Sequence, residues 1–447
     1  MLFLLASSFA ATLTVGPSGT YPQPCAAIAA AAAGDVIEVE AEGDYAGDSC
    51  AWSTDNLTIR GVNGRPTLDG TGAALAQDKG IFVIQAPTAT IENLNFIGAS
   101  VPDANGAGIR HQGTNLIVRD CLFRDNQNGI LGSPAEDGTG NVEIVRSEFD
   151  HNGAGDGYSH NLYLGHYASV MFRSSWSHRG NVGHLFKSRA LRNVILVSRL
   201  TDEEGGTASY EIDLPNAGDA WIIGSIVEQV STTSNNALIS YGLEASGMNP
   251  IHALHVINST LVNHHNRGLF LSIGADMETP AEVVNTVLSG PGSLSSQAAA
   301  VYTTSWSDAD GNPEFVNGSQ LDFTLAATSL LIDAGTDPGE LGPQSEYVHP
   351  ANEWPRNLMN AAWDIGAFEY GNEGIPDEIQ DTGDTADMGE GDSSEDGGRD
   401  SVSTPATDCG CDAGGSAGCG ALLAAGTLVR RRRAGGGYPS EATTPGA

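Results

Sequence analysis

A lysine and an arginine two residues apart are the strongest chemical signal in the chain. Lys187 and Arg189 stand in Leu185-Phe186-Lys187-Ser188-Arg189, and the chain has one other lysine, Lys79. Such a pair suits β-elimination of a uronate, because Arg can neutralise the sugar carboxylate and acidify the proton at C5 while Lys removes that proton. A nearby His or Tyr would protonate the leaving oxygen. The candidate catalytic residues are therefore Lys187, Arg189, His184, Tyr163 and His160.

The surroundings of this pair are basic, although the chain as a whole is acidic. Twenty Lys and Arg against 55 Asp and Glu give a net charge of −35, which argues against a nucleic-acid partner because phosphates must be neutralised by basic side chains. The window between Asp156 and Asp202 nevertheless contains no acidic residue and includes Arg179. A positive patch on a negative body can attract an anionic ligand, and an acidic polysaccharide is the partner we expect.

The residues one repeat before and after Lys187 determine whether it forms a structural ion pair or is free to act in catalysis. If alternate residues of stacked strands face outward, we expect two outward rows. The rows are Asn161, Lys187, Glu211 and Tyr163, Arg189, Asp213. Two interpretations of these rows are open. Lys187 with Glu211 and Arg189 with Asp213 could form cross-strand ion pairs that only stabilise the fold, or the same side chains could form a catalytic site. The candidate substrate-binding residues are Asn161, Tyr210, Glu211, Asp213 and Arg179.

Two other chemistries are compatible with the same carboxylates. Glu211 and Asp213 could hold a Ca²⁺ that binds the substrate carboxylate, since hard cations prefer oxygen ligands. Two carboxylates at positions i and i+2 of a strand also approach the separation that an inverting glycoside hydrolase needs. No other cofactor is indicated, and no metal-ligand motif stands out.

The elements that position these residues are short repeated strands. Runs of alternating aliphatic residues end in a small or polar turn, as in Ile117-Val118-Arg119-Asp120, Ile144-Val145-Arg146-Ser147 and Val283-Val284-Asn285-Thr286. They recur about every 27 residues, which is typical of a solenoid coil with inward β-branched residues and side-chain ladders at its turns. Here the chain resembles the right-handed parallel β-helix proteins of the pectate-lyase-like superfamily. The resemblance implies an all-β fold and a polysaccharide ligand, and the Lys-x-Arg sequence is similar in kind to the pair used by β-helical lyases.

The N-terminal region predicts an exported protein whose first coil is covered by a helix. Residues 1–10 are apolar and end in small residues, as in a short signal peptide. The Ala-rich segment after Pro24 predicts a short capping helix over the open end of the coils. Cys25 and Cys50 flank the first segment and could form a disulfide in an oxidising compartment.

The C-terminal region changes character twice. Residues 301–371 should add coils and close the other end of the core, and residues 372–408 are acidic and predict a disordered linker. Residues 409–447 combine Cys409-Gly410-Cys411, an apolar run and an Arg cluster, which resembles the MYXO-CTERM sorting tails of surface proteins. The parallel β-helix itself is expected over residues 11–300.

We therefore expect an extracellular, monomeric β-helix protein retained at the cell surface or outer membrane through its tail. Its leading function is a uronate-polysaccharide lyase. A non-catalytic glycan-binding or adhesive module is the alternative, and a glycoside hydrolase is third.

Overall fold

The computed structural model describes residues 10–244 and 247–372. The predicted signal peptide, acidic linker and sorting tail lie outside the described residues, apart from Ala10 and Asn372. Within the described part, no helix reaches the length and apolarity that crossing a membrane requires.

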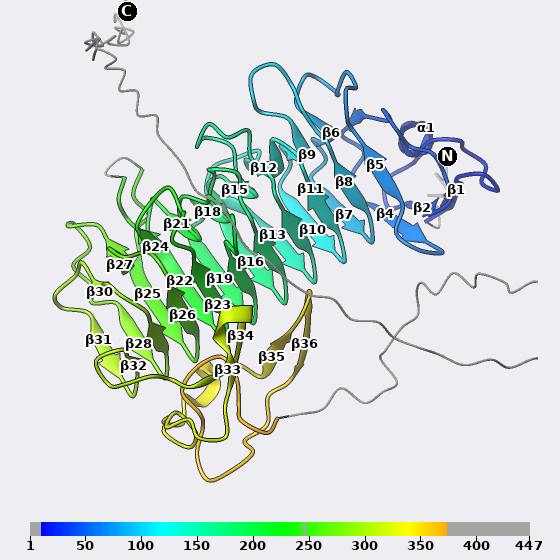
Figure 1. Ribbon diagram of the computed structural model, residues 1–447. Coiled ribbons are helices and arrows are strands. Elements are labelled where there is room, and N and C mark those ends of the chain that lie inside the picture. Colours follow the sequence, from blue (N-terminus) through cyan, green and yellow to red (C-terminus); the bar gives the residue numbers. More distant parts are fainter. Residues whose placement is uncertain (1–9, 245–246, 373–447) are drawn as a thin grey trace, which may run out of the picture. The chain divides into compact units, whose positions relative to one another are not determined.

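Three long parallel sheets make up most of the described chain (Figure 1). Sheet A has twelve strands: β1 (Thr12–Val15), β2 (Val36–Glu40), β4 (Leu57–Val62), β7 (Thr88–Glu92), β10 (Asn115–Arg119), β13 (Thr139–Val145), β16 (Tyr167–Arg173), β19 (Arg192–Leu196), β22 (Gly218–Ile223), β25 (His252–Ile257), β28 (Glu282–Val284) and β31 (Val301–Thr303). Sheet C has ten strands: β5 (Thr67–Asp69), β8 (Asn95–Ile97), β11 (Leu122–Arg124), β14 (Glu148–Asp150), β17 (Trp176–His178), β20 (Arg199–Thr201), β23 (Ile226–Gln229), β26 (Thr260–Asn263), β29 (Val287–Ser289) and β32 (Trp306–Ser307). Sheet B also has ten: β3 (Cys50–Trp52), β6 (Gly80–Ile84), β9 (Ala107–His111), β12 (Asn128–Gly132), β15 (Leu162–Leu164), β18 (Phe186–Ser188), β21 (Ile212–Leu214), β24 (Ala237–Tyr241), β27 (Leu269–Ile273) and β30 (Ser293–Ser295).

From β4 onward, each coil visits the sheets in the order A, C, B and then returns to sheet A one position further along. β10, β11 and β12 form one such coil, and each pairs in parallel with β13, β14 and β15 of the next. Equivalent residues are 26 positions apart between Cys121 and Ser147 and 27 between Ser198 and Ser225. The predicted parallel β-helix with coils of about this length is therefore confirmed.

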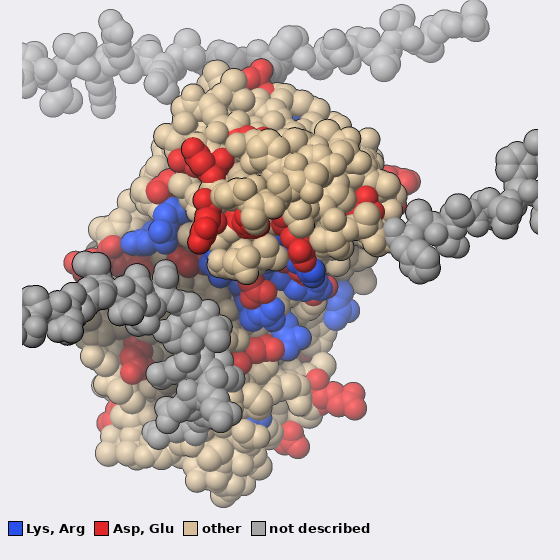
Figure 2. Space-filling model, turned by 90° about the vertical axis from the view of Figure 1, so that its right-hand side faces the viewer, with Lys and Arg blue, Asp and Glu red and all other residues tan. Residues whose placement is uncertain are grey.

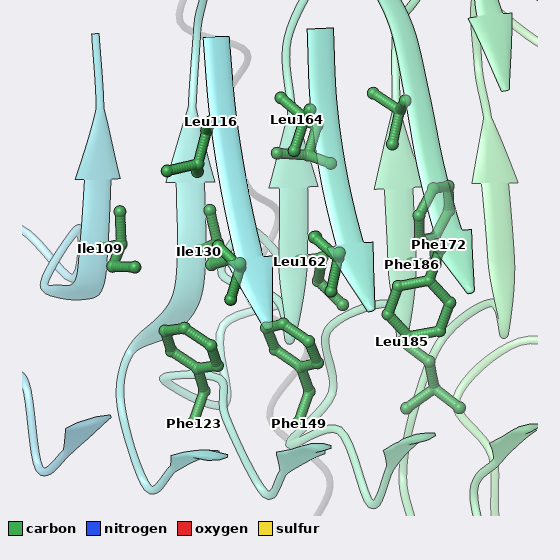
Figure 3. Packing of buried hydrophobic residues seen from close by; sticks show 14 of the residues in the cluster. Ile109, Leu116, Phe123, Ile130, Phe149, Leu162, Leu164, Phe172, Leu185 and Phe186 are labelled. Carbon is green, nitrogen blue, oxygen red and sulfur yellow. The ribbon is translucent and has the colours of Figure 1, made fainter. Parts of the chain in front are cut away.

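Large apolar side chains fill the space inside the coils. Phe96, Phe123 and Phe149 occupy the same position of successive coils, with ring centroids 5.0 and 4.7 Å apart. Figure 3 shows Phe123 and Phe149 stacked in this way, and Phe186 further along the core. All of these rings are fully buried. Burial of one such side chain is worth about 1.5–3 kcal/mol, so the core fixes which residue of each short strand points inward.

A hydroxyl ladder follows the turn from sheet A to sheet C. The amide of Cys121 donates to Ser147 Oγ at 3.1 Å, and the amide of Ser147 donates to Ser175 Oγ at 3.1 Å. The same bond recurs between later coils, up to Thr286 and Ser305. These buried hydroxyls satisfy turn amides that would otherwise lack a partner. The polar turn positions of the repeat are thus explained by side-chain ladders.

The N-terminal end of the coils is covered as predicted. Helix α1 (Pro24–Ala30) begins with proline, whose missing N–H costs nothing in a first helical turn, and it buries Ala27 and Ile28 against the core. Cys25 of this helix and Cys50 of β3 form a disulfide with Cα atoms 5.7 Å apart. The bond joins the cap to the first strand of sheet B.

Removing this disulfide should loosen the cap. Because it closes a segment with a sequence separation of 25, its loss should cost about 3 kcal/mol through the entropy of the unfolded chain. We expect Cys25→Ser/Cys50→Ser to unfold at lower urea concentration than the wild type, and reductant to shift the wild type alone. Equal midpoints for the oxidised wild type and the variant would contradict this.

The C-terminal segment begins with the last coil strands and then leaves the three parallel sheets. β31 and β32 still belong to sheets A and C. The chain then forms two antiparallel pairs, which are β33 (Phe315–Asn317) with β34 (Asp322–Leu325) and β35 (Ser345–Val348) with β36 (Asn352–Pro355), and two short turns, η1 (Gly318–Gln320) and η2 (Gly339–Leu341). Phe323 and Tyr347 pack on Ile226 and Val262, which lie on the outer face of sheet C. The segment therefore runs back along the flank of the coils (Figure 1).

Candidate functional site

Strand β18 places Lys187 on the outer face of sheet B. Phe186 is fully buried inside the coils, so the next residue points outward. Lys187 pairs with Tyr163 of β15 on one side and with Asp213 of β21 on the other, and Asp213 pairs with Ser240 of β24. Tyr163, Lys187, Asp213 and Ser240 form a straight row across four coils, which we call the outer row.

Lys187 is held by ionic contacts within the outer row. Its Nζ lies 2.7 Å from Asp213 Oδ2 and 5.5 Å from the centroid of the Tyr163 ring. Asp213 Oδ1 accepts a hydrogen bond from Ser240 Oγ at 2.8 Å. Lys187 is 8% exposed, so most of its side chain is shielded from solvent.

Arg189 lies beside the outer row, two residues after Lys187. Its Nε donates to Tyr163 Oη at 2.8 Å, and its Nη1 donates to Asn216 Oδ1 at 2.5 Å. Nη1 also lies 2.8 Å from Glu244 Oε2. Burial alone would lower the pKa of Arg189, but hydrogen bonds to Glu244 and Tyr163 outweigh that effect and raise it. Arg189 is therefore a permanent cation with a fixed orientation.

Two histidines and a tyrosine stack next to Lys187. The rings of His160 and His184 have centroids 4.5 Å apart, and His184 stacks on Tyr210 at 5.1 Å. Backbone amides donate to the Nδ1 atoms, from His184 to His160 at 2.9 Å and from Tyr210 to His184 at 3.2 Å. Each neutral ring therefore carries its proton on Nε2.

The pKa values of both histidines are lowered. Burial is the main cause for His160, and burial together with the charge of Lys187 lowers the pKa of His184 to about 3. Burial also raises the pKa of Tyr210. Both imidazoles are thus neutral near pH 7, and His184 Nε2 lies 3.4 Å from Asp213 Oδ2. The remaining hydroxyl of the predicted catalytic set is that of Tyr163, whose oxygen accepts a hydrogen bond from Arg189.

The predicted outward rows were wrong by two residues. Phe186 rather than Ser188 aligns with Ile212 in the core, so Lys187 meets Tyr163 and Asp213 instead of Asn161 and Glu211. Asn161 is fully buried, and its amide donates to Ser177 Oγ at 3.0 Å.

Glu211 is the largest departure from expectation. Its side chain is fully buried and neither carboxylate oxygen has a hydrogen-bond partner. Burial, with added repulsion from Asp202 and Glu228, raises the pKa of Glu211 well above its usual range. Glu211 consequently neither pairs with Lys187 nor shares a face with Asp213, and these two carboxylates cannot serve as a glycosidase pair.

Arg179 lies away from the outer row, at the corner between sheets C and B. It binds both oxygens of Asp150 at 2.9 and 2.7 Å, and Arg124 contacts the same carboxylate at 2.7 Å. Both arginines line a polar cavity of about 540 Å³ that also includes Asp125 and Glu204. The structure thus does not bring Arg179 together with Lys187.

The basic window of the sequence is not a positive patch on the surface. Acidic residues from neighbouring coils or from the C-terminal segment pair with Arg173, Arg179, Lys187, Arg189 and Arg192. Figure 2 shows Lys and Arg side chains lying among Asp and Glu on the face drawn. Sheet pairing places Asp150, Asp213 and Asp219 beside the window from about one coil away in the sequence. Glu244 and Glu353 reach it from outside the three parallel sheets.

The residues do not fit the predicted Ca²⁺ site. Glu211 is inside the coils, and Asp213 is already bound to Lys187. Among the described residues, Glu148, Asp150 and His178 do bring three ligand atoms within 4.8 Å of one another. Since Arg124 and Arg179 already neutralise Asp150, this group is explained by ion pairs.

Three residues of the site were not predicted from the sequence. Ser240 follows Asp213 in the outer row and could have been found by extending the correct register by one coil. Asn216 and Glu244 lie outside the strands, where the repeat gives no register. Both reach Arg189 directly.

Comparison with known structures identifies the fold. Pectate lyase Pel9A superimposes with a TM-score of 0.54 at 17% sequence identity, over 81% of this chain and 97% of that chain. The chain has a pectate-lyase-like right-handed β-helix fold. A pectin methylesterase from Aspergillus niger matches with a TM-score of 0.25 at 12% identity, over 74% of this chain and 93% of that one, and adds nothing to this conclusion. No protein-family model and no curated protein matches this chain.

Proposed function

We propose that this protein is a lyase that cleaves an acidic, uronate-containing polysaccharide by β-elimination at the outer row. The observation that supports it best is the convergence of Lys187 and Arg189 on Tyr163, with Arg189 Nε 2.8 Å from the hydroxyl. A base, a carboxylate-binding cation and a proton donor thus lie around one point on the outer face of sheet B.

In this proposal each residue has one task. Arg189 binds the uronate carboxylate and stabilises the negative charge that develops on it. Lys187 passes its own proton to Asp213, 2.7 Å away, and takes the proton from C5. The C5–H electrons form the C4–C5 double bond, the bond from C4 to the leaving oxygen breaks, and Tyr163 protonates that oxygen. Return of the Asp213 proton to solvent and reprotonation of Tyr163 complete the cycle.

A non-catalytic glycan-binding module is the second candidate. The low exposure of Lys187 and its short contact with Asp213 favour it, because a fully paired lysine is not available as a base. The two candidates differ in whether a bond is broken.

Absorbance near 235 nm distinguishes them, since β-elimination creates an unsaturated uronate. We expect the full chain to raise this absorbance on at least one polymer of a uronate panel, with equal rates in Ca²⁺ and EDTA because the candidate Ca²⁺ ligands do not come together. Binding without any absorbance change would move the assignment to the glycan-binding module, and neither binding nor cleavage would overturn both.

Export to the cell surface is part of the same proposal. The disulfide between Cys25 and Cys50 fits an oxidising compartment. A surface location would also give the protein access to extracellular polysaccharide, whether free or in a cell envelope. Fractionation of expressing cells, with detection of the folded body outside the cytoplasm, tests it.

A further inference from the structure

The two carboxylates at the Lys187 and Arg189 site are held very differently. The Asp213 side chain is 5% exposed, stands on strand β21 and is bound by Lys187 and Ser240 at 2.7 and 2.8 Å. The Glu244 side chain is 45% exposed and lies after the end of β24. Among the described cations, Arg189 lies 2.8 Å from the Glu244 carboxylate and Lys187 lies 3.9 Å away. Asp213 is therefore a fixed counter-ion, whereas Glu244 is exchangeable.

We propose that Glu244 occupies the subsite for the substrate carboxylate and must be displaced from Arg189 when a uronate binds. This inference rests on the proposed function, because it assigns Arg189 to that carboxylate. It also explains selectivity: a ligand with a carboxylate can replace Glu244 at Arg189, whereas a neutral ligand cannot.

Charge balance supports the exchange. Lys187 and Arg189 are neutralised by Asp213 and Glu244 in the free protein. An arriving carboxylate that replaces Glu244 leaves this balance unchanged, and Glu244, already half-exposed, loses little by turning to solvent. A neutral sugar would instead leave Arg189 without a carboxylate, which costs free energy because the guanidinium is more than half-buried.

The proposal predicts that removal of the Glu244 charge favours acidic ligands. In Glu244→Gln, Arg189 loses its internal carboxylate, so an oligogalacturonate should bind about two- to fivefold more tightly, as expected for a partly exposed ion pair. The methyl ester of the same oligomer has no free carboxylate and should show no gain. The matched control is Glu282→Gln, which removes a 58%-exposed carboxylate that pairs with His255 on sheet A.

Binding of the full chain to both oligomers can be measured by calorimetry, without relying on turnover. A cycle with Arg189→Gln, Glu244→Gln and the double variant tests the coupling: the gain from Glu244→Gln should vanish when Arg189 is absent. Equal or weaker binding of the acidic oligomer by Glu244→Gln overturns the inference, and so does an equal gain for the methyl ester. Tighter binding without any absorbance at 235 nm would retain the inference while removing the lyase assignment.

Discussion

Replacing Lys187 with alanine should reduce the rate of β-elimination by about 10²–10⁴-fold, the usual contribution of a positioned general base. The other groups of the site remain in this variant, since Arg189 keeps the bonds to Tyr163 and Asn216 that orient it. Substrate should therefore still bind, and the loss should appear in kcat more than in KM. Initial rates at 235 nm over a range of substrate concentrations measure both constants.

The controls for this variant follow from the ion pair. Lys187→Ala leaves Asp213 buried without its cation, which can cost about 3–5 kcal/mol and unfold the chain. Adding Asp213→Asn removes the unpaired charge, so the double variant should be folded and still inactive. Lys79→Ala removes the other lysine of the chain and should keep full activity. A folded Lys187→Ala protein with wild-type kcat would rule out Lys187 as the base.

The second large effect is on stability, which should fall as the pH rises from about 5 to about 8. Burial raises the pKa of Asp202 to about 8 and the pKa of Glu211 well above its usual value. These carboxyl groups keep their protons in the folded protein, while the unfolded chain releases them above about pH 4–5. Their contribution is complete below about pH 4 and is lost as the pH rises from there to the folded pKa, at up to about 1.4 kcal/mol per pH unit and group.

Glu211→Gln isolates this effect, because glutamine has a similar shape and does not ionise. The melting temperature of the wild type should drop over this range, and that of Glu211→Gln should drop less. His178 acts in the same direction, since carboxylate partners raise its pKa, so the difference between the two slopes is the measured quantity. The lowered pKa values of His160 and His184 affect stability mainly below pH 6.5. Parallel slopes for wild type and variant would show that Glu211 is ionised or solvated in the folded state.

The coils were predictable from the sequence because their turns recur with the same chemistry. Ser147, Ser198 and Ser225 stand at equivalent turns, and each is a member of one hydroxyl ladder in the structure. Each of these turns needs a side-chain hydroxyl to accept a hydrogen bond from a backbone amide. The same residue type therefore recurs once per coil, and this repeat is visible in a single sequence. The capping helix left a comparable signal in Pro24 and its alanine run.

The register of β18 was not predictable from alternation. A shift of two residues keeps every inward residue inward and every outward residue outward, so the pattern cannot distinguish the two alignments. Packing decides between them: Phe186 fills the core position beside Ile212, where Ser188 would leave a void. Assigning the largest apolar residue of each short strand to the core would have given the correct row.

Two further differences arise where the strands end. Asn161 and Glu211 directly precede strands β15 and β21, at the corner where the chain turns from sheet C into sheet B, and there the side chain is buried although alternation predicts it outward. Glu244 reaches Arg189 from beyond a strand end, where no repeat constrains the chain. The site therefore depends on corners and connections, whereas the repeat mainly encodes the core.

The side chains of the outer row are regularly spaced along the β-helix. Tyr163, Lys187, Asp213 and Ser240 follow one another across paired strands, so their spacing is that of the coils, about 4.8 Å. A linear polymer laid along the row meets one new side chain per coil, and each of these side chains lies outside the core of its own coil. The number of coils in the row therefore sets the length of ligand that can be contacted, and the residue in each coil sets the chemistry of that contact.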